Sequence, residues 1–410
     1  MTARERIYVC HTFYHVYVTC LKELAYRREA VPSKDGETDR KTKPGATLVL
    51  STMSTAFGTL VERARKSGLF EEVIEFDEKR DDFFPELAPL RKNTGSILTN
   101  MVNRIRFCKR LPELLAPYVP VDFRLYKEVY VFCDSDPIGY YLNANRVFYH
   151  AVEDGLNTLK RFDAARFDNR GAFPVKKFFA DMGWIFIQNG YAKYCLDMEV
   201  NDISVIGKDD ATCGVPDAKT LCSGKKPRYV EVSRKELADA LTASDKRLLA
   251  DLFVENMDGL RKVLSRGADR PRVLVLTEKI LDPEARKKMF TDIVSRYAVW
   301  NGKSAFVFVK PHPRDETDYA QVFANKKEDV AVLAGDFPME VLNLAEELRF
   351  DAVVSVFTQT DAVTFAKERI SLAEEFSYAA PEFRKTQLRK GQQHGRRTKE
   401  RGHRRQYSRG

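Results

Sequence analysis

The sequence predicts an α/β fold with two Rossmann-like domains that face each other across a cleft. Short runs of strand-forming residues alternate with helical segments, which is typical of parallel βαβ units. The alternation occurs twice, first in residues 1–206 and again in residues 271–380. Between the two runs, residues 207–270 hold a turn-rich loop and a connecting helix. A basic tail, 381–410, without apolar periodicity follows the second run and is expected to be disordered.

The first domain is expected to begin with a strand, a turn and an amphipathic helix. Its strands are expected at residues 7–10, 46–50, 73–76, 128–133 and 147–150, with a further helix over 96–115. We expect residues 160–200 to be irregular and aromatic. Residues 207–226 have the turn and charge composition of a linker or a long surface loop.

The second domain is expected to restart the same pattern after a long helix over residues 233–265. Its strands are expected at residues 272–278, 304–309, 330–334, 352–358 and 369–373, with helices at 283–297 and 338–348. Folds of this kind bind ligands at the carboxyl ends of their strands. Residues that follow the strands are therefore the first candidates for a site.

Composition excludes several classes of protein. The chain has 410 residues, of which 44% are apolar, so it can form two or three domains with real cores. No apolar run is long enough for a membrane helix, and the first residues lack the long apolar region of a signal peptide. Seven cysteines without metal-ligand spacing indicate reduced thiols and no metal site. We therefore expect a cytoplasmic protein.

The net charge of +9 belongs to the tail. Residues 384–410 contain 11 Lys and Arg and one Glu, a net charge of +10. The remaining 57 basic and 58 acidic side chains leave residues 1–383 at −1. The tail could contact anionic lipid headgroups at the inner face of the membrane, serve as an arm that binds a partner, or have no role.

The first motif that could carry chemistry is Glu153-Asp154-Gly155, at the end of a predicted strand. Two adjacent carboxylates can hold one with a raised pKa, which suits a general base. Gly155 would allow a sharp exit from the strand. An ordinary acidic turn after a strand has the same pattern, and this motif taken alone favours that interpretation.

The second motif is Lys310-Pro311-His312-Pro313-Arg314, which ends the strand at 304–309. An imidazole titrates near neutral pH and can protonate or hydrogen-bond a departing phosphate. Lys310 and Arg314 can balance phosphate charge. The flanking prolines stiffen the loop, which reduces the entropy lost on binding.

The third motif is SVFTQT, Ser355 to Thr360, at another strand end. Hydroxyl groups and free backbone N–H groups at such a position are typical of phosphate sites, although Ser and Thr caps are common. Weaker candidates are His11, Thr12 and His15 after the first strand, and Glu278 and Asp282 near the end of the strand at 272–278. Asp134 and Asp136 fit a turn better than a metal pair. Motifs of the common dinucleotide, NTPase and hydrolase folds are absent from the sequence.

Taken in chain order, EDG, KPHPR and the Ser/Thr segment resemble the bacterial sialyltransferases of the two-domain GT-B type. The sequence is most similar to the lipooligosaccharide sialyltransferases of glycosyltransferase family 52. The opening YVCHTFYHVYVT looks like that family's first strand and loop. The resemblance runs from about residue 5 to residue 375 and is dense only at the motifs, of which KPHPRD with SVFT is the most specific.

This resemblance implies an inverting transferase that moves sialic acid from CMP-sialic acid to a terminal sugar hydroxyl of a lipooligosaccharide or capsule, without metal or other cofactor. It implies that His312 assists the leaving phosphate, that Ser355 and Thr358 bind that phosphate, and that Asp154 is the base. Glu278 and Asp282 remain alternative bases. The catalytic candidates are His312, Asp154, Glu153, Glu278 and Asp282. The donor-binding candidates are Lys310, Pro311, Pro313, Arg314, Ser355, Thr358 and Gly155, and the acceptor-side candidates are His11, Thr12 and His15.

Two other functions remain open at this point. One is a hexosyltransferase of the same fold that uses a UDP-sugar. The other is a non-catalytic nucleotide- or RNA-binding protein that uses its basic tail, although residues 1–383 are neutral and carry no RNA-binding motif. The expected partners are a nucleotide-sugar donor and a glycan acceptor, with no specific nucleic acid. A homodimer is a further option.

Overall fold

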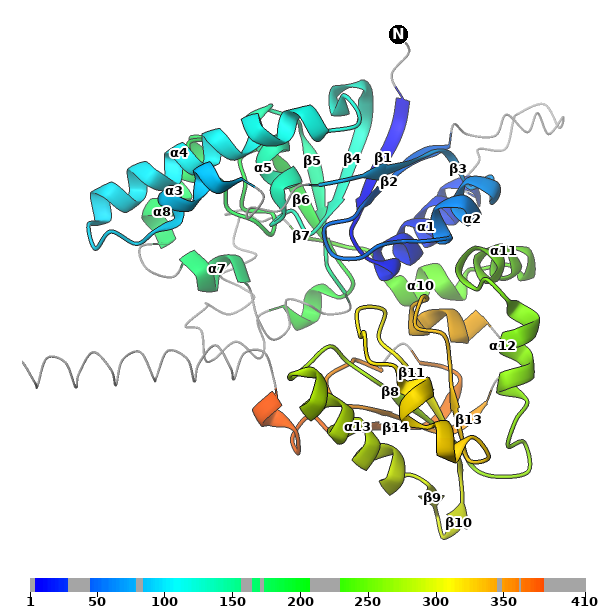
Figure 1. Ribbon diagram of the computed structural model, residues 1–410. Helices are drawn as coiled ribbons and strands as arrows, with labels where there is room; N and C mark the ends of the chain where they lie inside the picture. Colours follow the sequence, from blue (N-terminus) through cyan, green and yellow to red (C-terminus); the bar gives the residue numbers. More distant parts are fainter. Residues whose placement is uncertain are drawn as a thin grey trace, which may run out of the picture. The chain divides into compact units, whose positions relative to one another are not determined.

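The computed structural model describes residues 4–28, 45–78, 84–155, 164–169, 173–206, 229–344, 349–360 and 363–379. The chain divides into two compact units, Met1–Glu255 (unit 1) and Asn256–Gly410 (unit 2). Each unit is built on its own parallel sheet with helices beside it (Figure 1). The predicted α/β class with two Rossmann-like sheets is confirmed. The predicted tail and the loop at 207–226 lie outside the described residues.

Unit 1 contains a seven-stranded sheet in the order β3-β2-β1-β4-β5-β6-β7, in which all neighbouring strands are parallel. The strands are β1 (Arg4–Cys10), β2 (Ala46–Ser51), β3 (Phe70–Phe76), β4 (Tyr126–Phe132), β5 (Tyr149–Val152), β6 (Cys195–Val200) and β7 (Tyr229–Glu231). The helices are α1 (Phe13–Arg28), α2 (Leu60–Lys66), α3 (Ala88–Arg91), α4 (Ile97–Leu115), α5 (Pro137–Ala144), α7 (Ala164–Asn169), α8 (Phe173–Asp181), α10 (Arg234–Asp239) and α11 (Ala243–Phe253). Short 3-10 turns are η2 (Pro85–Leu87), η3 (Ala116–Tyr118), η4 (Phe123–Leu125) and η5 (Ile203–Val205).

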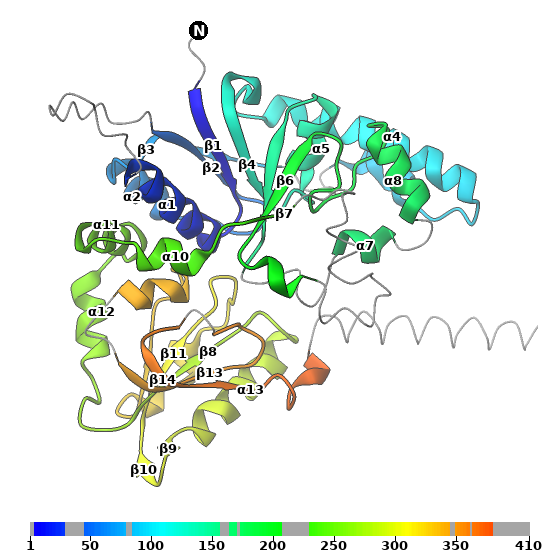
Figure 2. The same cartoon turned by 180° about the vertical axis from the view of Figure 1, so that it is seen from behind.

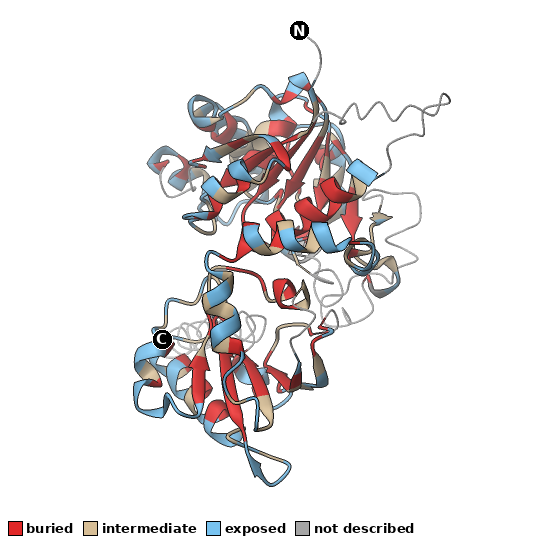
Figure 3. Cartoon of the chain, turned by 90° about the vertical axis from the view of Figure 1, so that its right-hand side faces the viewer, coloured by how far each residue is buried: buried red, intermediate tan, exposed pale blue. Residues whose placement is uncertain are grey.

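The two faces of this sheet differ because successive side chains of a strand point to opposite sides. On β1, Ile7 and Val9 join an apolar core with Ile138 and Leu142 of α5. The alternate residues Arg6 and Tyr8 contact α1 instead. Figure 3 shows the strands of both units as mostly buried.

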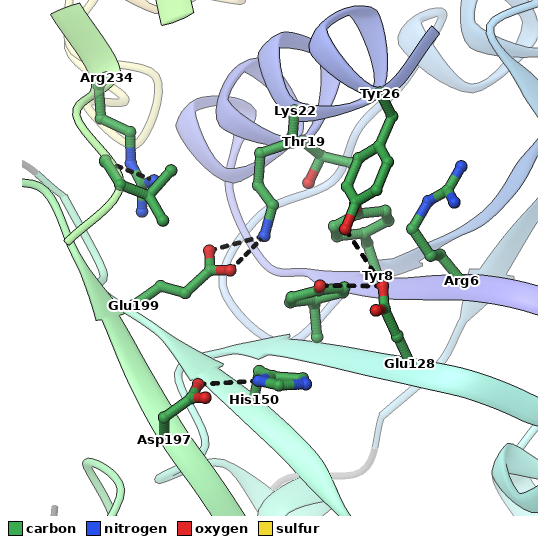
Figure 4. A network of polar contacts seen from close by, with 12 residues as sticks. Arg6, Tyr8, Thr19, Lys22, Tyr26, Glu128, His150, Asp197, Glu199 and Arg234 are labelled. Carbon is green, nitrogen blue, oxygen red and sulfur yellow. Dashed lines mark hydrogen bonds and ion pairs between the residues drawn. The ribbon is translucent and has the colours of Figure 1, made fainter. Parts of the chain in front are cut away.

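A buried polar network lies between α1 and the sheet (Figure 4). Lys22 of α1 donates to both carboxylate oxygens of Glu199 on β6 at 2.7 and 2.6 Å, and its ammonium lies 3.6 Å from the ring centroid of Tyr130. Burial lowers the pKa of Lys22, with the charge of Glu199 opposing this. Arg6 pairs with Glu23 at 2.8 Å. Such paired groups fix the position of α1 more than they stabilise it, since desolvation offsets most of their attraction.

Unit 2 contains a five-stranded parallel sheet in the order β12-β11-β8-β13-β14. Its strands are β8 (Arg272–Leu276), β11 (Phe306–Lys310), β12 (Val330–Val332), β13 (Phe350–Ser355) and β14 (Ala366–Ser371), and β9 (Val299–Trp300) pairs with β10 (Lys303–Ser304) in a separate hairpin. The helices are α12 (Met257–Leu264), α13 (Pro283–Arg296) and α14 (Tyr319–Val322), with 3-10 turns η7 (Ala324–Lys326), η8 (Met339–Leu344) and η9 (Ser377–Ala379). The apolar face of α13, with Met289, Phe290, Ile293 and Val294, packs against Val273 and Val307 of the sheet.

Three expectations about local structure are corrected. Residues 160–200 are not all irregular, because they contain α7, α8 and the sheet strand β6. The single helix expected over 233–265 is three helices, each started by its own cap: Ser233, Thr242 and Asn256 accept backbone N–H groups. The segment after Pro338 forms the 3-10 turn η8 rather than an α-helix as far as it is described.

No helix in the described part of the chain combines the length and the apolar character needed to cross a membrane.

Candidate functional site

The carboxyl ends of β8, β11 and β13 meet at the middle of the sheet of unit 2. In this strand order the chain runs outward from β8 to β11 and β12 on one side, then returns to β13 and β14 on the other. Ligands of doubly wound folds bind at such a reversal. Thr277 and Glu278 follow β8, His312 follows β11, and Ser355 ends β13. The KPHPR and SVFTQT motifs therefore meet at one edge, together with Glu278.

The KPHPR loop is fastened by Asp315, whose carboxylate is fully buried. Its Oδ1 forms an ion pair with Arg286 Nε of α13 and accepts the backbone N–H of Thr317, both at 3.1 Å. Its Oδ2 accepts from the hydroxyl groups of Thr277 at 2.8 Å and Tyr319 at 2.9 Å. Three hydrogen bonds and one ion pair thus satisfy this carboxylate, which fixes the loop against β8 and α13.

His312 is held in one tautomer by its own loop. Its Nδ1 accepts the backbone N–H of Arg314 at 3.1 Å, so in the neutral ring the proton is on Nε2. Its own N–H donates to Thr277 Oγ1 at 3.1 Å. Burial and then the charges of Arg314 and Lys310 together lower the pKa of His312 to about 4, with Asp315 opposing the shift. The ligand-free imidazole is therefore a neutral hydrogen-bond donor through Nε2.

Lys310 is a buried cation under this loop. Its ammonium donates to the carbonyl of Pro311 at 3.0 Å and lies 4.2 Å from the ring centroid of Phe337. Burial lowers the pKa of Lys310 to about 7, although Asp336 and Glu340 oppose the shift. Burial likewise raises the pKa of Glu340 to about 7. Because Arg314 is exposed at the same edge, an arriving anion would meet one permanent charge and one that titrates near neutral pH.

Glu278 shapes the third motif. Its Oε1 accepts the backbone N–H of Phe357 at 2.7 Å and also that of Thr358. Ser355, which is buried, donates its hydroxyl to the carbonyl of Thr358 at 2.8 Å. These contacts close the turn after β13 and fix its position relative to β8.

The remaining candidates of unit 2, Asp282, Pro311 and Pro313, shape the chain around the site. Asp282 is the N-cap of α13, where its side chain accepts the N–H of Ala285 at 3.0 Å. Pro311 is buried and Pro313 is half-buried. They flank His312 as the sequence indicated, and they limit the backbone conformations of the loop.

A second cluster lies at the carboxyl ends of the strands of unit 1. His15 on α1 accepts the N–H of His11 through Nδ1 at 3.1 Å, which puts the proton of the neutral ring on Nε2. That Nε2–H donates to Asp154 Oδ1 at 2.7 Å. The ring of His15 also stacks on Phe132, with centroids 4.4 Å apart. The EDG motif and the first loop are thereby brought together.

His11 is surrounded by acids from other strand ends. Its Nε2 lies 3.0 Å from Glu78 Oε2 and 3.6 Å from Asp136 Oδ2. Burial opposes protonation of His11, but the hydrogen bond and charge of Glu78, with Asp136 and Asp154, raise its pKa above the ordinary value. Burial raises the pKa of Asp136 to about 6, with the charge of His11 opposing. Asp136, expected in a plain turn, belongs to this cluster.

The two carboxylates of the EDG motif are in different environments. Glu153 is buried and accepts the N–H of Asn201 at 2.7 Å, whereas the side chain of Asp154 is 54% exposed. Gly155 has a φ of 89°, which side chains rarely allow, so the sharp exit at this position needs glycine. Thr12 accepts the N–H of His15 at 3.2 Å and so starts α1.

One group among the described residues has the spacing of a metal site. His11, His15 and Cys133 each offer a ligand atom, and these atoms lie within 4.8 Å of one another. Nδ1 of His11 is buried without a hydrogen-bond partner. Both nitrogens of His15 are engaged, however, and burial and then the charges of Asp154 and Asp136 raise the pKa of the Cys133 thiol well above its usual range. An ion would have to displace Asp154 from His15 and deprotonate this thiol, so the cluster suits hydrogen bonding better.

Comparison with known families identifies the chain. Residues 114–370 match the model of glycosyltransferase family 52. This protein belongs to glycosyltransferase family 52. The matched range spans more than half of the chain and includes EDG, KPHPR and SVFT, so the family predicted from these motifs is confirmed. His11 and His15, in the cluster of unit 1, precede the matched residues.

Similar proteins were found by sequence and by structure. An uncharacterized protein of Haemophilus influenzae is 31% identical over 160 residues, which cover 38% of this family 52 chain and 45% of that protein. The match thus spans less than half the length of that relative. Among solved structures, a 2,6-sialyltransferase of Photobacterium sp. JT-ISH-224 in complex with CMP and lactose aligns with a TM-score of 0.52 at 10% identity, over 90% of this chain and 71% of that one. This likeness shows the GT-B fold.

A further solved structure covers nearly the same length. The α/β-galactoside α-2,3-sialyltransferase of Photobacterium phosphoreum has a TM-score of 0.47 and 10% identity, over 90% of this chain and 91% of that one.

Sequence reasoning missed the residues that hold both clusters in place. Asp315 was within the quoted motif but was not chosen, and its partners Arg286 and Tyr319 come from helices that give no sign of a site. Glu78 lies at the end of a strand pattern without any motif, yet its two oxygens contact His11 and the N–H of Ile138. A rule that every carboxylate within a few residues of a predicted strand end is a candidate would have included both acids.

Proposed function

We propose that this family 52 glycosyltransferase is an inverting, metal-independent sialyltransferase. It would move sialic acid from CMP-sialic acid to a terminal sugar hydroxyl of a bacterial surface glycan, lipooligosaccharide or capsule. The observation that carries the proposal is the strand-end arrangement of unit 2. A neutral imidazole with its Nε2–H available stands between a buried lysine and an exposed arginine, on a loop fixed by Asp315.

The reaction is a single displacement. The acceptor hydroxyl oxygen forms a bond to the anomeric carbon of sialic acid while the bond from that carbon to the phosphate oxygen of CMP breaks. The hydroxyl proton passes to a carboxylate of the enzyme, and CMP leaves with the bonding electron pair. Negative charge therefore grows on the phosphate, where preorganised donors lower the barrier.

His312 is the group we assign to the leaving phosphate. Its low pKa in the ligand-free protein comes from burial and from two neighbouring cations. A bound phosphate screens those cations and favours the imidazolium, so the same ring can first donate a hydrogen bond and then share its proton. Lys310 and Arg314 supply the charge that a phosphate requires, and Thr358 and Ser355 position the neighbouring turn.

Asp154 is the carboxylate we assign as the base. It is half exposed, and the Nε2–H of His15 orients it. The other candidates have contacts that a base would have to break: Glu153 holds the N–H of Asn201, Glu278 holds the turn after β13, and Asp282 caps α13. His15 and His11 then act as positioning residues on the acceptor side.

The proposal extends to location. A nucleotide-sugar donor made in the cytosol and a lipid-linked acceptor would meet at the inner face of the cell membrane. The basic tail at 384–410 could add contact with anionic lipids there.

Donor choice tests the proposal. Thermal shift and slow donor hydrolysis are measured in parallel with CMP-sialic acid, UDP-glucose and UDP-galactose, all with EDTA present. Stabilisation and CMP release with CMP-sialic acid only would support metal-free sialyl transfer. A response only to a UDP-sugar would discard sialyl transfer and favour a hexosyltransferase of the same fold. His312→Ala serves as the control, because a specific signal should weaken in it.

A further inference from the structure

Unit 1 exposes an apolar surface on two neighbouring helices, α4 and α8. The two helices lie side by side in both views (Figures 1 and 2), and Ile105 of α4 shares a buried cluster with Phe179 and Ala180 of α8. Around this contact, large side chains point outward. We call these residues the α4–α8 patch: Ile97, Leu98, Val102, Val175, Phe178, Met182 and Trp184.

The exposure in this patch is high. Ile97 is 84% exposed, Leu98 80% and Phe178 61%. Seven of the thirteen large apolar side chains that are exposed in the described chain belong to these two segments. This concentration of exposed large apolar side chains on two adjacent segments indicates an interaction site rather than scattered exposure.

Ile97 and Leu98 lie at the N-terminal end of α4, which is held by several hydrogen bonds. Ser96 caps α4 by accepting the N–H of Thr99 at 3.3 Å. Asn100 accepts the N–H of Thr94 at 2.9 Å and donates to Asn93 at 2.8 Å, and Asn93 also accepts the N–H of Gly95 at 2.9 Å. The two apolar side chains are thus held outward on a formed helix end and not on a frayed one.

The charge around the patch is strongly positive, in contrast to the rest of the folded chain. Residues 88–115 and 173–184 contain eight Lys and Arg against Glu113 and Asp181, a net +6, while residues 1–383 as a whole carry −1. Arg106, Lys109 and Arg110 are exposed on α4. The pKa of Lys176 is lowered by burial and then by the charge of Arg104, two cations close together on the two helices.

We propose that the α4–α8 patch docks onto the surface of an anionic phospholipid bilayer. Exposed aliphatic and aromatic side chains would enter the boundary between headgroups and acyl chains, while the surrounding Lys and Arg contact lipid phosphates. Trp184 suits this depth, because Trp favours the membrane–water interface. A second copy of the chain fits less well, since it would place one net +6 surface against another.

This inference does not depend on which sugar donor the protein uses. It is also separate from the basic tail, which could bind anionic lipids by charge alone. The two tryptophans of the chain distinguish the two modes, because Trp184 is in the patch, Trp300 is in unit 2, and the tail contains none.

The test uses the full chain and vesicles of phosphatidylglycerol and phosphatidylethanolamine with brominated acyl chains, which quench only a tryptophan that reaches them. In Trp300→Phe, Trp184 should shift its emission to the blue and lose roughly half of its intensity. In Trp184→Phe, the remaining Trp300 should stay unquenched. Vesicle binding with unquenched Trp184 would assign membrane contact to the tail and overturn the proposal, and so would an absence of binding.

A second measurement separates apolar insertion from charge. In about 0.5 M salt the Debye length falls to roughly 4 Å, so binding by the tail is largely screened. The double variant Ile97→Ser with Leu98→Ser should then lower vesicle partitioning by roughly tenfold or more, because two exposed apolar side chains no longer leave water. Val299→Ser, at an exposed position of unit 2, is the matched control and should bind like the original chain.

Self-association is the remaining outcome. If the patch were covered by a second copy, sedimentation would show a dimer that the Ile97/Leu98 double variant splits, with vesicle binding unchanged. That result would overturn the membrane proposal.

Discussion

The strand-end clusters of the two units occupy the same place in their sheets but have opposite electrostatics. In unit 1, Glu78, Asp136 and Asp154 surround the imidazoles of His11 and His15. In unit 2, His312 lies between Lys310 and Arg314. Both clusters hold a histidine whose Nδ1 accepts a backbone N–H, so His15 and His312 each present an Nε2–H.

The difference shows how one fold prepares two kinds of chemistry. The acid-rich end has an imidazole that donates to a carboxylate, which suits removal of a proton from a hydroxyl group. The cation-rich end has an imidazole that donates outward, which suits a phosphate. The topology decides where the groups meet, and the charged neighbours decide what the groups do there.

Asp154→Asn should give the largest effect, because it removes the proposed base and leaves the shape of the side chain. We expect turnover to fall by about 10³-fold, with donor affinity near the original value. Steady-state kinetics and donor titration measure the two quantities. Glu75→Gln, on the exposed side of β3, is the control. Normal turnover in Asp154→Asn would shift the role of base to Glu278 or Asp282.

His312→Ala should lower turnover by about 10²-fold and donor affinity much less, since the ring acts mostly on the charge that develops on the leaving phosphate. Equal losses in both would make His312 a binding residue only. His150→Ala is the matched comparison, because His150 pairs with Asp197 inside unit 1 at 2.8 Å. It should leave donor kinetics unchanged.

The histidines of the two clusters should titrate at different pH values, because their charged neighbours differ. NMR of the imidazoles should show His11 titrating above its ordinary range and His312 near pH 4 in the ligand-free protein. The raised pKa of His11 stabilises the fold at low pH, and this contribution is lost as the pH rises through that pKa. The lowered pKa of His312 has the opposite sign, so its contribution is lost as the pH falls from about 6.5 to about 4. Similar titration of both rings would remove the electrostatic contrast.

We expect the smallest effect from Lys310→Met. This variant should change protein stability and donor affinity in opposite directions. The lysine is charged in the unfolded chain, while burial lowers its pKa to about 7 in the fold. Replacing it should raise the free energy of unfolding by about 2 kcal/mol, most of all below pH 7 and less as the pH approaches 10. Donor affinity should fall. Denaturant unfolding measures the first effect, and Lys279→Met at the exposed neighbour Lys279 is the control.

The sequence was informative wherever structure follows from local pattern. Strand and helix periods predicted β1, α4, β8 and α13, and glycine at 155 and the prolines around His312 predicted two tight chain segments. Periodicity failed at β6, whose CLDMEV sequence includes a buried acid, because Glu199 is buried only as the partner of Lys22. A long-range ion pair of this kind has no local pattern.

The motif residues of the candidate site could be predicted from the sequence. The residues that hold them in place could not. Lys310, His312, Arg314 and Asp154 stand at strand ends in the sequence, so their positions could be foreseen. The roles of Asp315 and Glu78 depend on distant partners, Arg286 29 residues away and His11 67 residues away, which spacing does not reveal.

The buried carboxylate of Asp315 has a thermodynamic consequence for the donor. Its three hydrogen bonds and its ion pair with Arg286 assemble the KPHPR loop together with β8 and α13 when unit 2 folds. Little conformational entropy of this loop then remains to be lost on binding, so a donor should associate mainly through favourable enthalpy. Donor binding and the folding of unit 2 should also disappear together on heating, as a single cooperative event.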